Sequence, residues 1–565
     1  MHFIFNSIYS YFFNYLYLKK MNLDNIRQDL KEIYSQSNAR GLRQSLKWAS
    51  EMMLSLKSQT DINSKCLTVP DIDDTFEHHH LEPKPQIIFN LNNDYDYLFS
   101  KSVFDLGEYE RCAFFTQNYN NPESRFLHFY SKYLAIEKER LDKMVEPSSV
   151  IPQNSLKIFI ELRKNVEMLF ESDKNIKEDA YMQYLYGIIL LKLGLNNDAI
   201  LALTKSIFLD PLCWCSWHQL SRVIEDESQF NKIHLPNHWI KNFFLAAVYL
   251  ELQLNEYSLS LYEDLLNTFV DNNYIRTQLA VVKSNLREVE TAISLFNTIR
   301  NDDPYRLDSM DIYSNLLYVK EMQTELSSLA HIANQIDPFR VETCFSIANF
   351  YSLRGQHAKS VVYFSRALHL NPNHLSAWTL MGHEYVELKN TNAAIQAYRS
   401  AIKCCKRDFR AWYGLGQTYE ILKIPSYCLY YYSMAHFLKP NDTRLIVAIG
   451  QTYEKLSRYE DAANCYAKAG FSSLIKLASL YEKMNEEHKA AAVYNEFVNN
   501  FDNKQIVYNL QTTDITIAYK YLANYFFKYE KFQQAQIASQ MCMFFNETRD
   551  EAKELLNKLQ IVLEK

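Results

Sequence analysis

The sequence predicts an all-α protein built as a right-handed superhelical solenoid of paired helices. Turn-forming residues are scarce, since glycine (10) and proline (13) together make 23 of 565 residues, about 4%, against roughly 12% in an average protein. So few turn formers exclude sandwiches, propellers and Rossmann-type enzymes, which need many tight loops. Apolar residues make up 48% of the chain, which is enough for a long core. The third observation is a repeat of 34 residues.

Several columns of residue types carry this period. Small residues recur at Ala246, Ala280, Ser314, Ala348, Gly382, Gly416 and Gly450. Aromatic residues follow sixteen positions later at Tyr262, Phe296, Phe364, Tyr398, Tyr432 and Tyr466, with Ala330 interrupting the column. Prolines share one phase at Pro304, Pro338, Pro372 and Pro440. Chance does not align several columns over seven periods.

Each period predicts two short amphipathic helices, A and B, of one tetratricopeptide (TPR) unit. Small residues let the A and B backbones approach closely, and the aromatic residue of B fills the gap to the next A helix. The proline ends B. Trp378 and Trp412 lie four positions before their glycines, as the TPR pattern prefers. A single unit cannot bury its apolar face, so the units are expected to stack along one core.

The period also divides the chain. The expected parts are an extension at 1–20, N-terminal helices at 21–57, a loop at 58–92, TPR-like helices at 93–142, a linker at 143–153 and a TPR array at 154–562. The aromatic extension lacks a basic n-region and a cleavage site, so it is a poor signal peptide. It is expected to be disordered or non-native, with translation starting at Met21, and a membrane anchor is the less favoured alternative.

Motifs for chemistry are absent. There is no P-loop, no G-x-G-x-x-G and no G-x-S-x-G. The only histidine cluster is 78–80, whose three adjacent side chains cannot all face one ion. The ten cysteines form no C-x-x-C pair, which favours reduced thiols in a nuclear or cytosolic protein. The net charge of −6 argues against nucleic-acid binding. We therefore expect no enzyme activity, no metal and no cofactor.

The concave face of such an array is lined by the A helices and is the expected binding surface. Its candidate positions are Phe345, Asn349, Thr379, His383, Glu384, Tyr413, Gln417 and Glu420. Amides can bond an extended peptide backbone, aromatic rings supply apolar pockets, and glutamates suit a basic side chain. This groove predicts a peptide that carries an arginine. The alternative is that these side chains are solvated or packed on their neighbours.

A terminal-carboxylate clamp, as in chaperone-binding repeats, is disfavoured. Asn349 occupies one clamp-like place, but the place where a lysine is needed holds Phe345. Glu384 is expected to be exposed, so Glu384→Lys is expected to weaken peptide binding and leave the fold intact.

Longer segments resemble a particular family. They are PYRLDSMDIYSNLLYVK (304–320), FRVETC (339–344), YSLRGQHAKSVVYFSRALHLNP (351–372), AWTLMGHEYVELKNTNAAIQAYRSAI (377–402) and RAWYGLGQTYEILKIPSYCLYYYSMAHFLKPND (410–442). These segments closely resemble the family of subunit 8 of the anaphase-promoting complex (the cyclosome), a ubiquitin ligase that acts in the cell cycle. The resemblance spans about 24 to 562 and is specific in 304–442.

The resemblance implies a non-catalytic scaffold in nucleus and cytoplasm that homodimerises through its N-terminal repeats and stacks with other TPR subunits. It also implies that the later repeats hold the arginine-bearing C-box of the ligase's coactivators. In this sequence Glu384 would pair with the arginine and Asn349 would bond the backbone. Two rivals remain, a free-standing TPR adaptor or co-chaperone and an enzyme that uses a superhelix for substrate choice. No membrane or nucleic-acid partner is expected.

Overall fold

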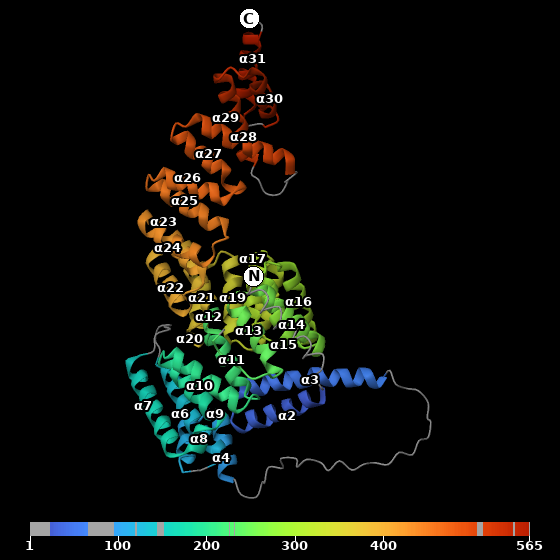
Figure 1. The fold of residues 1–565 in the computed structure, drawn as a ribbon, viewed down its shortest axis with the longest axis vertical. Helices are drawn as coiled ribbons and strands as arrows, with labels where there is room; N and C mark the ends of the chain where they lie inside the picture. The colour runs from blue at the N-terminus through green and yellow to red at the C-terminus, as the bar shows by residue number, and fades with distance from the viewer. Residues whose placement is uncertain are drawn as a thin grey trace. The chain divides into compact units, whose positions relative to one another are not determined.

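The computed structural model describes residues 23–65, 95–118, 121–143, 152–224, 226–230, 232–504, 512–545 and 548–563. Every regular element in these ranges is a helix, as predicted (Figure 1). No helix within them is long and apolar enough to cross a bilayer. The extension at 1–20 and the histidine cluster at 78–80 lie outside the described residues, as do most of the predicted loop and linker.

The chain forms two compact units, of which the first comprises residues up to 354 together with 369–372. Its helices are α2 (Leu23–Ala39), α3 (Arg43–Lys65), α4 (Tyr95–Asp105), α5 (Tyr109–Phe115), α6 (Pro122–Asp142), α7 (Gln153–Ser172), α8 (Lys174–Lys177), α9 (Ala180–Lys192), α10 (Asn196–Leu209), α11 (Trp214–Val223), α12 (Glu227–Phe230), α13 (Ile240–Glu251), α14 (Asn255–Thr268), α15 (Asn273–Asn285), α16 (Val289–Asp302), α17 (Met310–Val319), α18 (Gln323–Ile336) and α19 (Val341–Leu353). The expectation of a loop from residue 58 is wrong, because α3 continues to Lys65 through a stretch that contains neither glycine nor proline.

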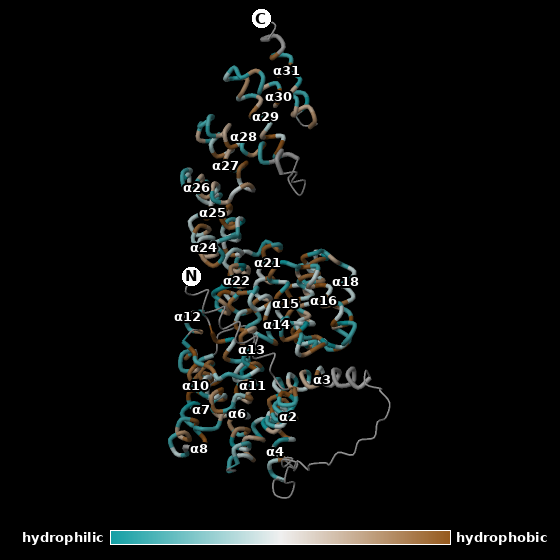
Figure 2. Tube along the Cα trace, turned by 45° about the vertical axis from the view of Figure 1, so that its right-hand side comes forward, coloured by the Kyte–Doolittle hydropathy of each residue, from teal (hydrophilic) through white to brown (hydrophobic). Residues whose placement is uncertain are grey.

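The second unit comprises 355–368 and residues from 373 onward. Its helices are α20 (His357–Leu370), α21 (Leu375–Glu387), α22 (Thr391–Cys404), α23 (Phe409–Ile421), α24 (Pro425–Leu438), α25 (Thr443–Lys455), α26 (Tyr459–Ala469), the 3₁₀ turn η1 (Phe471–Ser473), α27 (Leu474–Lys483), α28 (Glu487–Lys504), α29 (Thr512–Lys528), α30 (Phe532–Cys542) and α31 (Arg549–Leu563). Figure 2 shows hydrophobic and hydrophilic residues alternating along these helices, as amphipathic packing requires.

Close approach of the paired helices depends on the small-residue column. A Cβ atom on Gly382 would lie 2.6 Å from the ring of Tyr398, and one on Gly414, in the next A helix, would lie 2.5 Å from the same ring. Tyr398 is fully buried and therefore fills the space between its own A helix and the following one. This arrangement confirms the predicted role of the aromatic column.

The turns between helices A and B share a backbone conformation that recurs in every repeat and that the sequence did not reveal. A positive φ recurs every 34 residues, at Gln253, Arg287, Glu321, Gly355, Lys389, Lys423 and Ser457. Only one of these is glycine, although a side chain in this conformation costs roughly 1–2 kcal/mol. At the six non-glycine turns a backbone bond across the turn offsets the cost, as where the Asn390 N–H donates to the Tyr385 carbonyl at 2.9 Å. Scarce glycine therefore does not prevent tight turns here.

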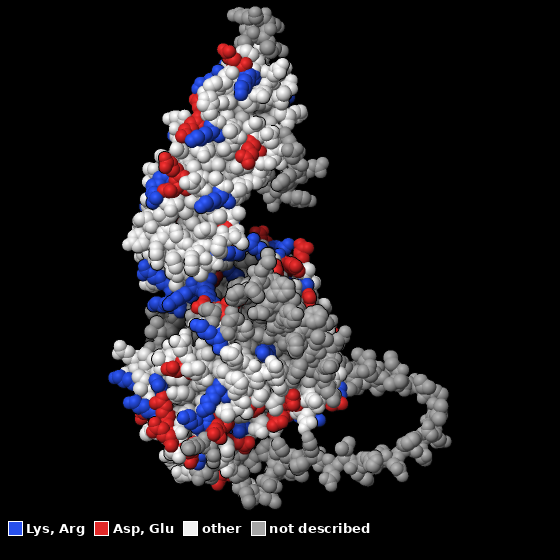
Figure 3. Space-filling view, in the orientation of Figure 1, with Lys and Arg blue, Asp and Glu red and all other residues white. Residues whose placement is uncertain are grey.

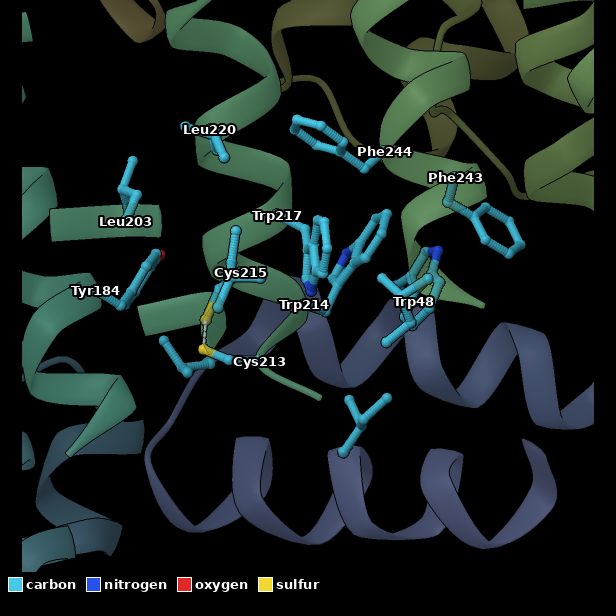
Figure 4. Close-up of a cluster of buried hydrophobic side chains, with 14 of the residues drawn as sticks. Trp48, Tyr184, Leu203, Cys213, Trp214, Cys215, Trp217, Leu220, Phe243 and Phe244 are labelled. Carbon is cyan, nitrogen blue, oxygen red and sulfur yellow. Dashed lines mark hydrogen bonds between the residues drawn. The ribbon is translucent and has the colours of Figure 1, made fainter. Parts of the chain in front are cut away.

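The first unit has an aromatic core in which the N-terminal helices take part (Figure 4). Trp48 of α3 stacks on Trp214 with ring centroids 3.9 Å apart and lies 6.0 Å from Trp239. Phe243 packs edge-on against Trp48 at 5.5 Å. The helix α3 also contacts α11 and α15. The N-terminal segment, which is out of phase with the repeat, is thus an integral part of this unit.

One helix cap in the second unit makes stability depend on pH. The Asp442 carboxylate accepts bonds from the backbone and guanidinium N–H groups of Arg444 at the start of α25. These bonds lower the pKa of Asp442 from 3.8 to about 2. A depressed folded-state pKa gives a stabilisation that is fully present above the unfolded value and is lost as pH falls through about 2.

We expect Asp442→Asn to lower the free energy of unfolding by about 1 kcal/mol at neutral pH, because the amide keeps the cap but loses the ion pair. The difference from the parent protein should shrink as the pH is lowered through the acidic range. Urea unfolding at several pH values measures it. A difference that stays constant down to the acid limit would contradict this role for the carboxylate.

Candidate functional site

The candidate peptide-binding residues are divided between the two units. Phe345 and Asn349 lie on α19 of the first unit. The others lie on two A helices of the second unit, with Thr379, His383 and Glu384 on α21 and Tyr413, Gln417 and Glu420 on α23. The structure therefore places six of the eight candidate positions in one unit.

Asn349 is almost fully buried, with 1% of its surface exposed. Its amide donates a hydrogen bond of 3.0 Å to the Ser314 hydroxyl on α17. Ser314 is the small residue of the preceding repeat, so this bond joins successive A helices. In the described structure Asn349 is therefore packed on the preceding A helix, and its contact with a peptide backbone stays a prediction.

Glu384 is also buried, with 4% of its surface exposed, so the expectation of an exposed glutamate is wrong. One carboxylate oxygen lies 2.8 Å from Nδ1 of His357, at the start of α20. Placing a lysine here would bury a cation beside the histidine at a cost of several kcal/mol. Glu384→Lys is therefore expected to destabilise the fold, and glutamine is the suitable replacement.

His383 is half-buried next to Glu384. Its Nδ1 lies 2.8 Å from the Tyr398 hydroxyl of the same repeat. Burial lowers the pKa of His383 below its usual value, so the ring is neutral at physiological pH. A neutral imidazole in this place offers hydrogen bonding rather than charge.

Tyr413, Gln417 and Glu420 follow one another at helical spacing along α23, and all three are half-buried. The Tyr413 ring packs against Tyr432 with centroids 5.4 Å apart. Tyr413 and Gln417 thus present an aromatic edge and an amide on a single helix face. This combination suits an extended peptide, whose backbone needs hydrogen bonds and whose side chains need apolar surface.

Glu420 is engaged within the repeat array itself. It accepts hydrogen bonds from the Tyr432 hydroxyl at 2.8 Å and from Lys455 at 2.6 Å. Burial alone would raise the pKa of Glu420, but these two bonds hold it below its usual value. The same arrangement recurs one repeat later, where Glu454 accepts bonds from Tyr466 and Lys483.

These recurring glutamate–tyrosine bonds, here called the carboxylate ladder, were not among the predicted features of the site. In the sequence a glutamate stands twelve positions before Tyr432 and again before Tyr466, and Glu482 and Tyr494 repeat the spacing with a bond of 2.6 Å. The ladder borders a cavity of about 420 Å³ lined by Glu420, Gln451, Glu454, Lys455, Tyr459 and Lys483. From the sequence, groove glutamates such as Glu420 were expected to attract a basic side chain. Because lysines already pair with Glu420 and Glu454, this cavity attracts cations less strongly than expected.

The chain's own α3 packs against the N-terminal ends of A helices in the first unit. The amide of Asn272 donates to the Glu51 carbonyl at 3.3 Å, and the guanidinium of Arg306 pairs with the Glu51 carboxylate at 3.2 Å. Lys47 forms a further ion pair with Asp308. A peptide could not occupy this surface without displacing α3, which leaves the second unit as the better candidate.

Chemical machinery is not evident in the described ranges. They contain no group of three or more histidine, cysteine, aspartate or glutamate side chains that could hold a metal ion. The cysteines within these ranges are free thiols. Burial raises the pKa of the thiols of Cys112, Cys428 and Cys542, which makes them poor nucleophiles.

Comparisons with known proteins agree with this picture. The family model "Anaphase promoting complex subunit 8 / Cdc23" matches residues 25–280. Tetratricopeptide-repeat models match 341–374, 382–421, 443–469 and 472–504. These matches confirm the repeat fold on both sides of the boundary between the units.

Individual relatives extend the likeness over the chain. "Anaphase-promoting complex subunit 8" of Dictyostelium discoideum is 35% identical over 95% of this chain and 98% of its own length. The protein of the same name from Arabidopsis thaliana is 40% identical over 53% of this chain, and "Cell division cycle protein 23 homolog" of Homo sapiens is 42% identical over 55%. The matched segment spans only about half of each of these two relatives, at 51% and 49% of their lengths.

A weaker likeness connects the chain to a solved structure. The crystal structure of the APC/C hetero-tetramer Cut9-Hcn1 aligns with a TM-score of 0.46 and 15% identity, over 83% of this chain and 96% of that chain. This likeness is too weak to support an inference about this chain.

Proposed function

Because this chain belongs to the anaphase-promoting complex subunit 8 / Cdc23 family, we propose that it is a non-catalytic scaffold subunit of the anaphase-promoting complex, a ubiquitin ligase. The observation that carries the proposal is the likeness to the Dictyostelium discoideum relative, which extends over 95% of this chain and 98% of that one. The stacked helix pairs support it, since such arrays offer long surfaces to other proteins.

We further propose that the chain homodimerises through its N-terminal repeats, stacks with other TPR subunits and works in nucleus and cytoplasm. Its second unit is proposed to dock the arginine-bearing C-box of a coactivator. Glu384 is the partner proposed for the arginine, because its carboxylate can accept charge-assisted hydrogen bonds from a guanidinium. Tyr413 and Gln417 would supply an apolar edge and an amide to the peptide, with His383 and Glu420 beside them. A backbone contact from Asn349 stays a prediction.

The docking proposal predicts that Glu384→Gln weakens binding of a labelled C-box peptide by about tenfold or more, because a charge-assisted bond is lost while the side-chain shape is kept. Fluorescence anisotropy on the full chain measures the affinity. Glu387→Gln is the matched control, since that glutamate is exposed on the same helix. A peptide with citrulline in place of arginine should bind parent and Glu384→Gln equally. Unchanged affinity of Glu384→Gln for the arginine peptide would refute the assignment.

Co-purification tests the wider proposal. The tagged chain, expressed at its native level, should recover other anaphase-promoting complex subunits by mass spectrometry. A free-standing adaptor would instead recover chaperones or a few unrelated clients. Recovery of the chain without any ligase subunit would contradict the scaffold role.

A further inference from the structure

Three consecutive B helices of the second unit carry no acidic residue. They are α20, α22 and α24, each 14 residues long. At the chain's average of 66 acidic residues in 565, three such helices would carry about five. The next B helix, α26, returns to the ordinary mixture with Glu460 and Asp461. Acidic residues are therefore missing only locally, from the B helices of neighbouring repeats.

Basic side chains occupy the exposed stripe of the first two of these helices. The exposed cations are Lys359 and Arg366 on α20 and Arg399 and Lys403 on α22. Within the described residues, Arg366, Arg399 and Lys403 form no ion pair, whereas Lys455 and Lys483 on the A helices do. Arg366 lies over the Tyr363 ring at 4.8 Å, and Arg399 donates to the Tyr419 hydroxyl at 3.2 Å. The carboxylates of the described residues therefore leave the positive charge of these three side chains without a counter-charge.

The third helix, α24, has no charged residue of either sign but exposes large aromatic side chains. Tyr427, Tyr430 and Phe437 have 54%, 57% and 78% of their surface exposed. Phe437 lies 34 residues after Lys403, so it occupies the equivalent place one repeat later. Figure 3 shows this change along the unit, with blue side chains gathered over α22 and an uncharged surface over α24.

Exposing these large aromatic side chains to water is energetically unfavourable. Exposed aromatic clusters are typical of interaction sites, where tyrosine and phenylalanine are enriched. Unpaired cations next to them select a partner of opposite charge. From these two features we propose that the B-helix face of α20, α22 and α24 docks an acidic segment of a partner protein that also carries aromatic or aliphatic side chains. This surface is separate from the A-helix residues of the proposed C-box site and does not depend on that site.

Nucleic acid is the other polymer that basic and aromatic side chains can bind. Tight binding to DNA typically neutralises about 6–10 phosphates along a continuous track. Here four cations lie on two helices, and the third helix offers none. The arrangement fits a short acidic segment followed by apolar anchors better than a polyanion.

A labelled synthetic peptide, with a run of glutamates followed by leucine and phenylalanine, tests the proposal by fluorescence anisotropy on the full chain. We expect Arg399→Glu combined with Lys403→Glu to weaken its binding by about tenfold, and the loss to diminish as salt is raised. Tyr427→Ser combined with Tyr430→Ser should weaken it by a similar factor that salt changes little. Lys403→Glu alone, at an exposed position, should show part of the effect even if Arg399 also contributes to folding.

The matched control reverses two exposed lysines elsewhere in the unit, Lys468→Glu with Lys531→Glu, which changes the net charge equally. This pair should leave peptide binding unchanged. An equal loss in the control, or no peptide binding to the parent protein, would overturn the proposal. Tighter binding of a single-stranded DNA oligonucleotide than of the peptide would overturn it in favour of nucleic acid.

Discussion

Replacing Gly416 by leucine is expected to lower the free energy of unfolding of the second unit by about 1–3 kcal/mol, because the helix pair α23–α24 has no room for a side chain there. A Cβ atom alone on Gly416 would lie 2.3 Å from the ring of Tyr432, which is fully buried. Either the ring or the helix must move, and both are packed on neighbouring repeats. Thermal unfolding followed by circular dichroism measures the loss.

The steric clash between residue 416 and Tyr432 can be tested by replacing Tyr432 as well. If the Tyr432 ring causes the clash, Gly416→Leu combined with Tyr432→Leu should be less destabilised than the sum of the two single changes. Tyr432→Leu alone is costly because it also removes the bond to Glu420. An unchanged melting temperature in Gly416→Leu would reject the assigned phase of the repeat.

The second large effect is expected at Trp48, whose replacement by alanine should cost about 3–5 kcal/mol. The side chain is 4% exposed and lies against Trp214, Trp239 and Phe243. Its removal leaves a cavity where α3 meets the repeats. Denaturant unfolding should show the loss, and limited proteolysis should cut α2 and α3 before the later helices.

Leu54→Ala is the control for this change. Leu54 lies on the same helix with 71% of its surface exposed, so its truncation should alter the unfolding midpoint little. If Trp48→Ala and Leu54→Ala behave alike, α3 does not belong to the core of the first unit.

Much of the fold was predictable because its signal is periodic. Small residues, aromatic residues and prolines repeat every 34 positions, and each column has one packing role in every unit. The A–B turn was hidden because lysine, arginine, glutamine, glutamate and serine occupy a conformation that favours glycine. When a backbone hydrogen bond fixes a turn, different residue types can occupy it, and the sequence then shows no recurring residue at that position. The packing of α3 was hidden for a related reason, since Trp48 meets residues far away in the sequence.

The candidate site was less predictable than the fold. Helical spacing placed His383, Glu384, Tyr413, Gln417 and Glu420 on two A helices of one unit, but it could not show what covers each side chain. Glu384 is covered at the start of α20 by His357, which lies 27 residues earlier. The lysine that neutralises Glu420 lies 35 residues later. Exposure in a stacked array depends on such neighbours from adjacent repeats.

The most direct measurement of the central claim is gradient sedimentation of the tagged chain from its native source, with ubiquitin-ligase activity assayed in every fraction. The scaffold account predicts that the chain migrates with other anaphase-promoting complex subunits in the fractions that form ubiquitin conjugates. It also predicts that the purified chain alone forms none. Migration apart from that activity, or conjugate formation by the isolated chain, would contradict the account.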